Sequence, residues 1–375
     1  MNASVPSTTP ESLADAVRLS MIAGVGPRLR KALLEAFGTP HAVLHAAPSD
    51  LLRVPGIGNQ LARRIAVACD EIDVQAELAR CAEQGITILT DADSAYPRVL
   101  REIYDPPGIL YVRGEIQPQD ALAIAIVGAR HATHYGVSQA ERLAGSLARA
   151  GITIVSGLAR GIDAAAHRGA LAAEGRTLAV LGSGLLKMYP PEHRELADEV
   201  ARHGAVLSEM PPLSPPSSGA FPQRNRLISG LSLGVLVIEA STNSGALITA
   251  RHAMEQGREV FAVPGRIDSR LSHGCHRLIR DGARLVESVD DVLEELGPLV
   301  APAASVDGTT VHHPAELRLN DVEQTVLAAV TNEPTTIDAV VAASGLATPQ
   351  VLSTISVLEM RRLVRRLGGN RIVRP

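Results

Sequence analysis

Aromatic side chains and lysine are scarce in this chain. It contains no tryptophan, three phenylalanines and five tyrosines among 375 residues. A nucleic-acid site in such a chain must depend on arginine and backbone amides more than on aromatic rings that stack with bases. The only lysines are Lys31 and Lys187, so nearly all of the positive charge is carried by arginine, whose forked guanidinium suits contacts with phosphate.

Cysteine is also rare, and long apolar runs are absent. Cys69, Cys81 and Cys275 show neither CxxC spacing nor an even number, so we expect reduced thiols and no zinc or other metal site. No 18 successive residues are apolar, and the start MNASVPSTTPESLADAV lacks the basic and then apolar run of a signal peptide. These absences predict a cytoplasmic protein that does not contact a membrane.

The net charge of −4 argues at first against a nucleic-acid partner. The acids are unevenly distributed, however, and gather between Glu287 and Glu295. The composition therefore still allows a local basic face.

Residues 1–70 contain a short internal repeat. LSMIAGVGPRLRKALLEAFG (19–38) and LLRVPGIGNQLARRIAVACD (51–70) each place two glycines in a turn between helical patterns. Such turns need positive φ and expose successive backbone N–H groups, as in an all-α, SAM-like pair of helix-hairpin-helix units. The glycines are Gly24, Gly26, Gly56 and Gly58, and the flanking arginines are Arg28, Arg30, Arg63 and Arg64. Contact with a DNA backbone and a purely structural helical scaffold both remain open.

Residues 71–297 are predicted to form one α/β domain. After a helix at 72–83 and a strand at 86–89, apolar strand candidates alternate with helical stretches. The strand candidates lie at 122–127, 152–155, 177–181, 205–208, 234–240, 259–263 and 284–286. This alternation favours a doubly wound, mostly parallel sheet, in which ligands bind at the carboxyl ends of the strands.

The C-terminal part is predicted to be a linker and a small domain. Residues 298–315 are rich in Pro, Ala and Ser, as linkers often are. Residues 316–375 contain three helical patterns and then two short strands around Gly368 and Gly369, an order typical of a winged helix. Winged helices bind proteins about as readily as DNA, so the sequence leaves both kinds of partner open for this domain.

Glycine-rich or polar loops follow the predicted strands. The motifs are VGARHATHYG, SGLARGIDAAAH, GSGLLKMYPPEH and EASTNSGALITA, with FPQRNRLISG before the last of these strands. Their small residues let backbone amides and helix N-termini approach a phosphate. The small residues are Gly128, Ser156, Gly157, Gly161, Gly182, Gly184, Ser244 and Gly245, and the basic ones are Arg130, Lys187, Arg224 and Arg226. Four such loops at one sheet edge favour an extended polyanion site, and the alternative is ordinary turn chemistry with solvated arginines.

Asp163 and His167 stand one helical turn apart, which raises the alternative of an acid-base pair. An aspartate in a first helical turn also satisfies loop amides, and a histidine one turn further on can hydrogen-bond to it. No nucleophile elbow, second carboxylate or metal set accompanies the pair. The fingerprint GxGxxG is missing, so we predict no dinucleotide cofactor and no catalytic residues.

The motifs between residues 75 and 290 closely resemble the DNA-processing protein A family, called DprA or Smf. The resemblance is carried, in order, by IVGARHATHYG, SGLARGIDAAAHRGAL, GSGLLKMYPPEH, SEMPP, FPQRNRLISGLS, VLVIEASTNSGALITARHAMEQGREVFAVPG and GCHRLIRDGARLV. It implies an extended Rossmann-like domain that binds single-stranded DNA without catalysis, forms a homodimer, and loads the recombinase RecA during natural transformation.

The family's functional positions map onto this sequence only where its motifs match. The implied DNA-binding residues are Gly128, Arg130, Ser156, Gly157, Gly161, Lys187, Arg224, Asn225, Arg226, Ser244 and Gly245. The implied dimer contacts are His276, Ile279 and Leu285. The chain departs from the family at Leu186, where an Asp is usual, and at Pro191 and His193, where a basic residue and Asn are usual.

Two other functions compete with this interpretation. Phosphoribohydrolases that act on nucleoside monophosphates have a related core, but their PGGxGT loop is replaced here by NSGALITA. The chain could also act as a protein adaptor through the winged helix.

Overall fold

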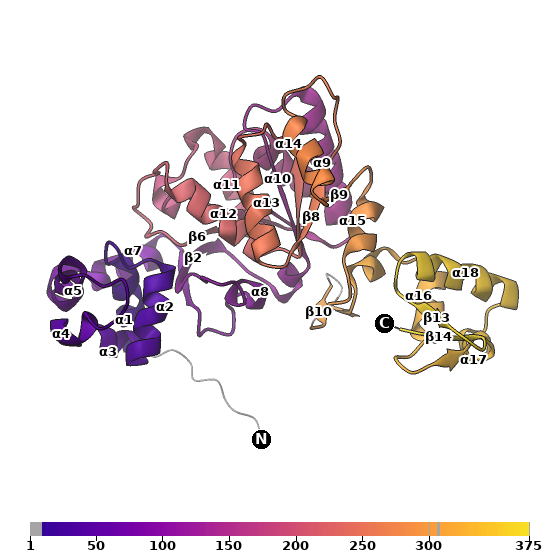
Figure 1. Ribbon diagram of the computed structural model, residues 1–375, viewed down its shortest axis with the longest axis horizontal. Helices are drawn as coiled ribbons and strands as arrows, with labels where there is room; N and C mark the ends of the chain where they lie inside the picture. The colour runs from indigo at the N-terminus through magenta and orange to yellow at the C-terminus, as the bar shows by residue number, and fades with distance from the viewer. Residues whose placement is uncertain (1–9, 300, 306–307, 375) are drawn as a thin grey trace.

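The structure, a computed structural model, describes residues 10–299, 301–305 and 308–374. Helices at the N-terminal end are followed by a large sheet with helices on both faces, and a small helical unit with a β-hairpin lies at the C-terminal end (Figure 1). The fold class expected from the sequence is thereby confirmed.

The N-terminal part is built from two helical hairpins that pack against each other. Its helices are α1 (Pro10–Met21), α2 (Pro27–Phe37), α3 (Pro40–Leu44), α4 (Pro48–Leu51), α5 (Asn59–Ala66), α6 (Ala68–Glu71) and α7 (Val74–Glu83). Gly24 and Gly56 have φ of 101° and 89°, which side chains with a Cβ rarely adopt. A Cβ on Gly56 would lie 3.0 Å from Leu29 of α2, and one on Gly24 would lie 3.4 Å from Leu61 of α5. Each turn therefore packs on the helix that follows the other turn.

Two of the four arginines beside these turns make hydrogen bonds to other parts of the protein. Arg30 is buried and makes two hydrogen bonds to the carboxylate of Asp91, of 2.8 and 2.9 Å. Arg64 donates to the carbonyl oxygen of Ala23 over 3.1 Å. Arg28 and Arg63 are exposed.

A nine-stranded sheet forms the centre of the molecule, in the order β1-β2-β6-β5-β4-β3-β7-β8-β9. Its strands are β1 (Thr87–Thr90), β2 (Ile109–Gly114), β3 (Ala123–Gly128), β4 (Thr153–Ser156), β5 (Thr177–Val180), β6 (Ala205–Ser208), β7 (Gly234–Ile238), β8 (Glu259–Ala262) and β9 (Arg284–Leu285). The seven strands from β6 to β9 are parallel, whereas β2 runs antiparallel to β1 and β6. The sequence interpretation missed β2, because this strand follows a stretch punctuated by prolines.

Helices cover both faces of this sheet, so a hydrophobic core lies on each side of it. Successive residues of a strand point alternately into one core and the other. In β3, Ile124 and Ile126 belong to one core, and Ala125 and Val127 to the other. α9 (His134–Arg149), α10 (Ile162–Ala172) and α15 (Val289–Glu295) pack on the first face, and α11 (Arg194–His203) packs on β5 and β6. α8 (Arg98–Arg101), α12 (Ala220–Gly230), α13 (Gly245–Glu255) and α14 (His273–Arg280) pack on the second.

The segment expected to be a linker contains regular structure. β10 (Ala303–Ala304) pairs antiparallel with β11 (Thr310–Val311), and the 3-10 helix η4 (Pro314–Arg318) follows. The next helices are α16 (Asp321–Ala328), α17 (Ile337–Ser344) and α18 (Thr348–Met360). They pack with a small sheet in the order β12-β14-β13, made of Thr335–Thr336, Arg371–Val373 and Arg365–Leu367. The winged helix is as expected, with β12 as an additional strand.

No single helix within the described ranges is long and apolar enough to cross a membrane. Only α17 and α18 taken together satisfy the criteria of length and composition, and these two helices are bent by 111° relative to each other.

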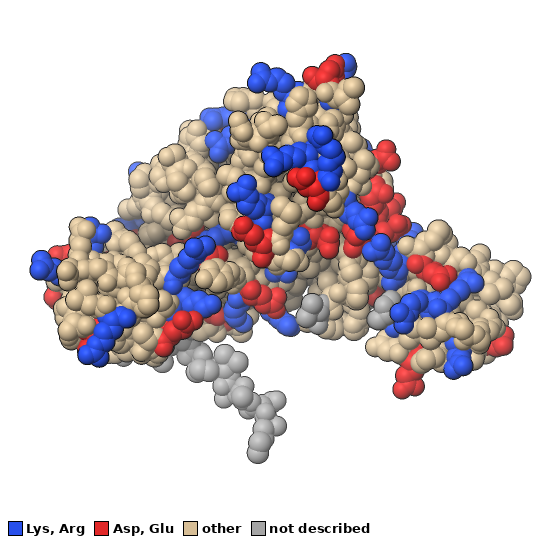
Figure 2. Space-filling model, viewed as in Figure 1, with Lys and Arg blue, Asp and Glu red and all other residues tan. Residues whose placement is uncertain are grey.

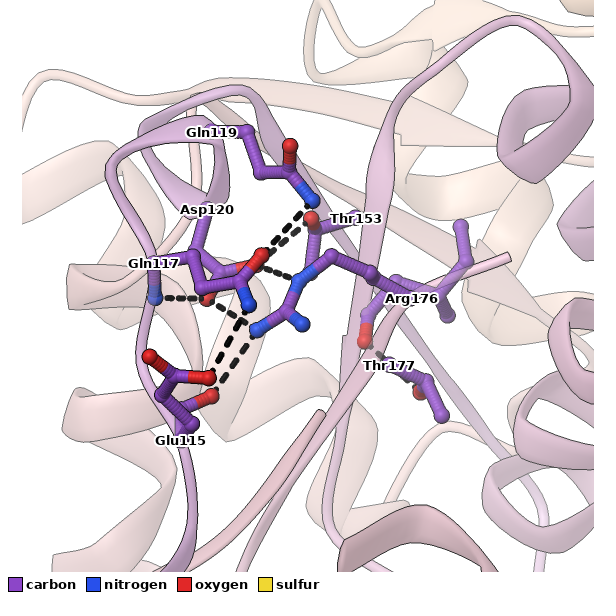
Figure 3. A network of polar contacts seen from close by, with 8 residues as sticks. Glu115, Gln117, Gln119, Asp120, Thr153, Arg176 and Thr177 are labelled. Atoms are coloured by element: carbon purple, nitrogen blue, oxygen red, sulfur yellow. Dashed lines mark hydrogen bonds and ion pairs between the residues drawn. The ribbon is translucent and has the colours of Figure 1, made fainter. Parts of the chain in front are cut away.

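A polar network stands at the amino ends of the parallel strands, opposite the edge where ligands are expected (Figure 3). Asp120, in the 3-10 helix η1 (Pro118–Ala121), is 5% exposed. It accepts hydrogen bonds from Thr153 Oγ1 at the start of β4 and from two guanidinium nitrogens of Arg176, just before β5. Because the chain before β3 is thereby tied to its two neighbours, this network fixes one end of the sheet.

We expect Asp120→Ala to lower the free energy of unfolding by about 3 kcal/mol, because breaking a buried ion pair leaves a guanidinium without its counter-charge. Chemical denaturation measures the change. Asp120→Asn keeps the shape and one acceptor oxygen and should cost less than the alanine variant. Equal stability of the wild-type protein and the alanine variant would show that the network is not needed.

Candidate functional site

A cavity of about 550 Å³ opens at the carboxyl ends of β3 and β7. From β3 the chain continues through β4, β5 and β6 on one side and then returns to place β7 on the other side. Such a reversal leaves a crevice between two neighbouring loops, which is the usual ligand position in doubly wound sheets. The loops after β3 and β7 and the starts of α10, α12 and α13 line this cavity.

The cavity brings together about half of the DNA-binding residues that the sequence indicated. Those that line it are Gly128, Arg130, Arg224, Asn225, Ser244 and Gly245. Ser156, Gly157, Gly161, Lys187 and Arg226 are not among the lining residues. Ser156 is buried and donates its hydroxyl to the Ile126 carbonyl oxygen over 2.6 Å, so it joins β4 to β3. Lys187 is exposed in the short 3-10 helix η2 (Leu185–Lys187).

Three of the predicted glycines are required by close packing of the loops. A Cβ on Gly128 would lie 1.8 Å from the carbonyl oxygen of Ile238. A Cβ on Gly157 would lie within 2.7 Å of the Arg224 guanidinium. Gly161 has φ of 75° and would place a Cβ 2.3 Å from the carbonyl oxygen of Ala129. These residues shape the wall of the site, whereas a Cβ on Gly245 would meet nothing within 4 Å.

Arg224 is the buried basic group of this site, with 4% of its surface exposed. Its Nη1 donates to the carbonyl oxygen of Gly157 over 2.8 Å and also to that of Val180. Asp163, at the start of α10, accepts the N–H groups of Gly157 (3.2 Å) and Ala159 (3.4 Å). Burial raises the pKa of Asp163 and lowers the pKa of Arg224 to about 10, while the charge of each partly offsets the effect on the other. Together they fix the loop after β4.

Arg226 points away from the cavity, which corrects its assignment as a partner of Arg224 at the pocket. Its guanidinium forms an ion pair with Glu209 and donates to the carbonyl oxygen of Asp105 over 2.6 Å. Residues two apart on an α-helix are separated by about 200° around its axis, so the two arginines of QRNR face opposite sides of α12. Arg226 supports α12 from behind.

A row of cations and rings runs along the rim of the cavity, and the sequence interpretation missed it. The exposed Arg130 lies over the Phe221 ring with its guanidinium carbon 5.4 Å from the ring centre. The Phe221 ring lies 5.7 Å from that of Tyr189, and Arg160 lies 5.6 Å from the Tyr189 ring centre. Phe221 lines the cavity, whereas Arg160 turns to an ion pair with Glu192.

His167 does not act as a partner of Asp163. Its Nδ1 lies 2.7 Å from Thr177 Oγ1, which itself donates to the carbonyl oxygen of Ile154 over 2.8 Å. Nδ1 must therefore carry the proton and donate it to Thr177. Burial, with smaller effects of the charges on His193 and Arg224, lowers the pKa of His167 to about 3, so the ring is neutral at pH 7. The expected hydrogen bond to Asp163 is wrong, because the ring packs against β5 instead.

The predicted dimer contacts lie at the far edge of the sheet. β9 is the last strand of the sheet, and its Leu285 is 45% exposed. Ile279 is half-buried, and His276 Nε2 lies 2.9 Å from the carbonyl oxygen of Gly265. Their role in a dimer stays a prediction.

We expect the stability of the protein to fall as the pH drops from about 6.5 towards 3. In this window the unfolded chain protonates His167 and the folded protein does not, so acid favours unfolding. His167→Asn keeps a donor for Thr177 and removes this titration, and should flatten the dependence of unfolding free energy on pH. His203→Asn controls for the loss of an exposed imidazole. An unchanged slope in His167→Asn would contradict the assignment.

Comparison with known proteins agrees with this architecture. A model for DNA recombination-mediator protein A matches residues 87–297. A model for a SAM-like helix-hairpin-helix tandem matches residues 9–71, and one for the DprA winged helix domain matches residues 311–370.

Individual relatives extend the similarity over most of the chain. Protein Smf of Synechocystis sp. is 37% identical over 385 residues, which cover 95% of this chain and 97% of the relative. The structure of DNA processing protein A from Streptococcus pneumoniae matches with a TM-score of 0.66 at 36% identity and covers 76% of this chain and 98% of its own. DNA processing protein A from Helicobacter pylori, whose structure concerns its single-stranded DNA binding mode, matches with a TM-score of 0.50 at 31% identity over 55% of this chain and 93% of its own. The chain belongs to the DNA recombination-mediator protein A family, also known as DprA or Smf.

Proposed function

We propose that the protein binds single-stranded DNA in the cavity between β3 and β7 and serves DNA processing during DNA uptake. The observation that carries this proposal is the convergence of Arg130, Arg224 and the start of α13 on one cavity at the switch point of the sheet. The related protein from H. pylori, which binds single-stranded DNA, supports the choice of ligand.

The phosphate-binding part of this proposal depends on one exposed and one buried cation. Arg130 is exposed at the cavity, so its guanidinium reaches a phosphate without first breaking an ion pair. Gly245 begins α13, and its surroundings are open, so its own N–H group and the helix dipole favour an anion there, while Ser244 already accepts the N–H groups of Ala246 and Leu247. Arg224 adds positive potential from below, although its hydrogen bonds hold the loop.

The rim of the cavity favours a single strand over a duplex. Unpaired bases stack on aromatic rings, and Phe221 and Tyr189 stand together beside Arg130. In a duplex the bases are covered by their own neighbours and leave such rings unused. Two of the chain's few aromatic residues are thus placed where an unpaired base would use them.

We infer that the site works without catalysis. The neutral ring of His167 is bonded to Thr177, and Asp163 is committed to loop amides, so neither is arranged to transfer a proton to a ligand. No group of three or more His, Cys, Asp or Glu suited to a metal ion occurs in the part of the chain that the structure describes. Release of free base from nucleoside monophosphates would contradict this inference and favour the phosphoribohydrolase alternative.

Arg130→Ala should weaken binding of labelled oligo-dT and reduce its dependence on salt. Each phosphate contact to a single strand contributes about 0.7 to the slope of log affinity against log salt concentration, and the variant should lose about that amount. Fluorescence anisotropy at several salt concentrations measures both quantities.

Arg202→Ala is the matched control for Arg130→Ala, because Arg202 is an exposed arginine at the end of α11. It should bind DNA as the wild-type protein does. If both variants lose the same affinity, general charge rather than the cavity explains the binding.

The same proposal includes a homodimer through β9 and the loading of RecA onto the bound strand. An edge strand with an exposed Leu285 is suited to pairing with a second copy, because its outer backbone groups and apolar side chain need a partner. Two joined protomers would bind a single DNA strand in both of their cavities. The DNA between the two cavities would then be ordered and accessible to the recombinase.

Leu285→Arg should convert the dimer to a monomer, because it places like charges opposite each other across a two-fold interface. Analytical ultracentrifugation measures the mass, and the rate of RecA assembly on oligo-dT measures loading. The wild-type protein should accelerate assembly, and the variant should accelerate it less. An unchanged mass would contradict the interface, and a wild-type protein without effect on RecA would contradict the loading role.

A further inference from the structure

Tyr104 is the most unusual aromatic residue of the chain, because 71% of its surface is exposed. It lies in the loop between α8 and β2 and faces the N-terminal helices. The guanidinium carbon of Arg28 and the Nζ atom of Lys31 each lie 5.4 Å from the centre of its ring. Both cations belong to α2, one turn apart, so they converge on a ring that another part of the chain supplies.

The two cations make no ion pair among the described residues, although Glu35 stands one helical turn beyond Lys31 on α2 and Asp91 and Asp105 come from loops beside this helix. Asp91 is bonded to Arg30, and Asp105 interacts with Arg226. These two aspartates are thus paired with other arginines and not with Arg28 or Lys31.

Figure 2 shows Lys and Arg side chains gathered where α2 meets the sheet domain. Arg28 and Lys31 are both attracted to the Tyr104 ring by cation–π contacts, but their like charges repel each other, and the rest of the exposed ring leaves apolar surface in water. An anion between the cations and a flat apolar group on the ring would relieve both costs, and a nucleotide supplies both.

The loop that carries Tyr104 is held between α2 and the helix that borders the cavity. On one side, Arg226 of α12 donates to the carbonyl oxygen of Asp105. On the other side, Arg30 of α2 packs so closely on Gly108 that a Cβ there would lie 2.0 Å from its Nε atom. Tyr104 is therefore presented by a fixed loop.

A second hollow of about 420 Å³ lies between the main cavity and this region. It is lined by the first glycine turn, by Gly108 and by Gln223 of α12. The main cavity is lined by Pro222 and Arg224, the residues on either side of Gln223 in the sequence. The first turn of α12 thus borders both hollows, and a strand that leaves the cavity across this turn is directed towards the N-terminal helices.

We propose that Arg28, Lys31 and Tyr104 form a second binding site for the same single strand, in which a base stacks on the Tyr104 ring and a phosphate binds the two cations. The proposal rests on the proposed function of the main cavity and extends its DNA path to the helix-hairpin-helix part. It also selects one face of that part, since Arg30 and Arg64 beside the glycine turns are already engaged and, of the exposed Arg28 and Arg63, Arg28 is the one at the Tyr104 ring.

The test compares oligo-dT of increasing length on the full chain. A short oligonucleotide that fills only the main cavity should bind wild-type protein and Tyr104→Ala equally. A longer one that reaches α2 should bind the variant at least about 5-fold more weakly, since stacking of one base is worth that much or more. Tyr104→Phe keeps the ring and should bind as the wild-type protein does.

Controls separate this site from general charge and from the main cavity. Arg28→Ala should weaken binding of the longer oligonucleotide only. Arg53→Ala, which removes an exposed arginine of the same part of the chain, should leave the binding of both oligonucleotides unchanged. Arg130→Ala should weaken the binding of both the short and the longer oligonucleotide. Thermal unfolding of Tyr104→Ala should match the wild-type protein, because the ring is exposed.

Two outcomes remain distinguishable. If the wild-type protein binds neither oligonucleotide, the proposed function fails. If it binds both and Tyr104→Ala binds the longer one with wild-type affinity, the main cavity stands and the second site is overturned.

Discussion

The buried guanidinium of Arg224 is the interaction on which the site depends. Two carbonyl oxygens, from the loop after β4 and from the end of β5, accept its hydrogen bonds, and Gly157 must lack a side chain to let it pass. Asp163 holds the amides of the same loop, so a buried carboxylate and a buried guanidinium fix this loop from two sides. Because one helix and two strand ends meet at this cation, the cavity has a rigid floor.

The amino and carboxyl ends of the parallel strands have different roles. At the amino ends of the strands, Asp120 and Arg176 tie three strand ends together through a hydrogen-bonded network. At the carboxyl edge, the loops leave Arg130 exposed and the start of α13 open. The residues that stabilise the sheet and those that face a ligand thus lie at opposite ends of the strands. The binding loops can therefore differ while the sheet is unchanged.

The sequence predicted the parallel strands and the three helices of the winged helix well, because long apolar patterns with a clear period determine them. It missed β2, since prolines precede that strand and its pairing with β6 is remote in sequence. It placed Arg224 and Arg226 together, although their spacing on a helix already separates them. It also had no signal for the row of Arg130, Phe221 and Tyr189, whose members come from three different loops or helices.

The sequence by itself determined the order of the parallel strands and their helices, the end of these strands where ligands are expected, and the family to which the chain is similar. These follow from local patterns, since periodicity and turn residues act over a few positions. Only the tertiary structure decided which arginines remain available. Arg224, Arg226 and Arg30 are held by internal acceptors, whereas Arg130 and Arg28 lie beside aromatic rings at the surface. The physical reason is that the partner of each guanidinium comes from a distant part of the chain, and folding alone brings the two together.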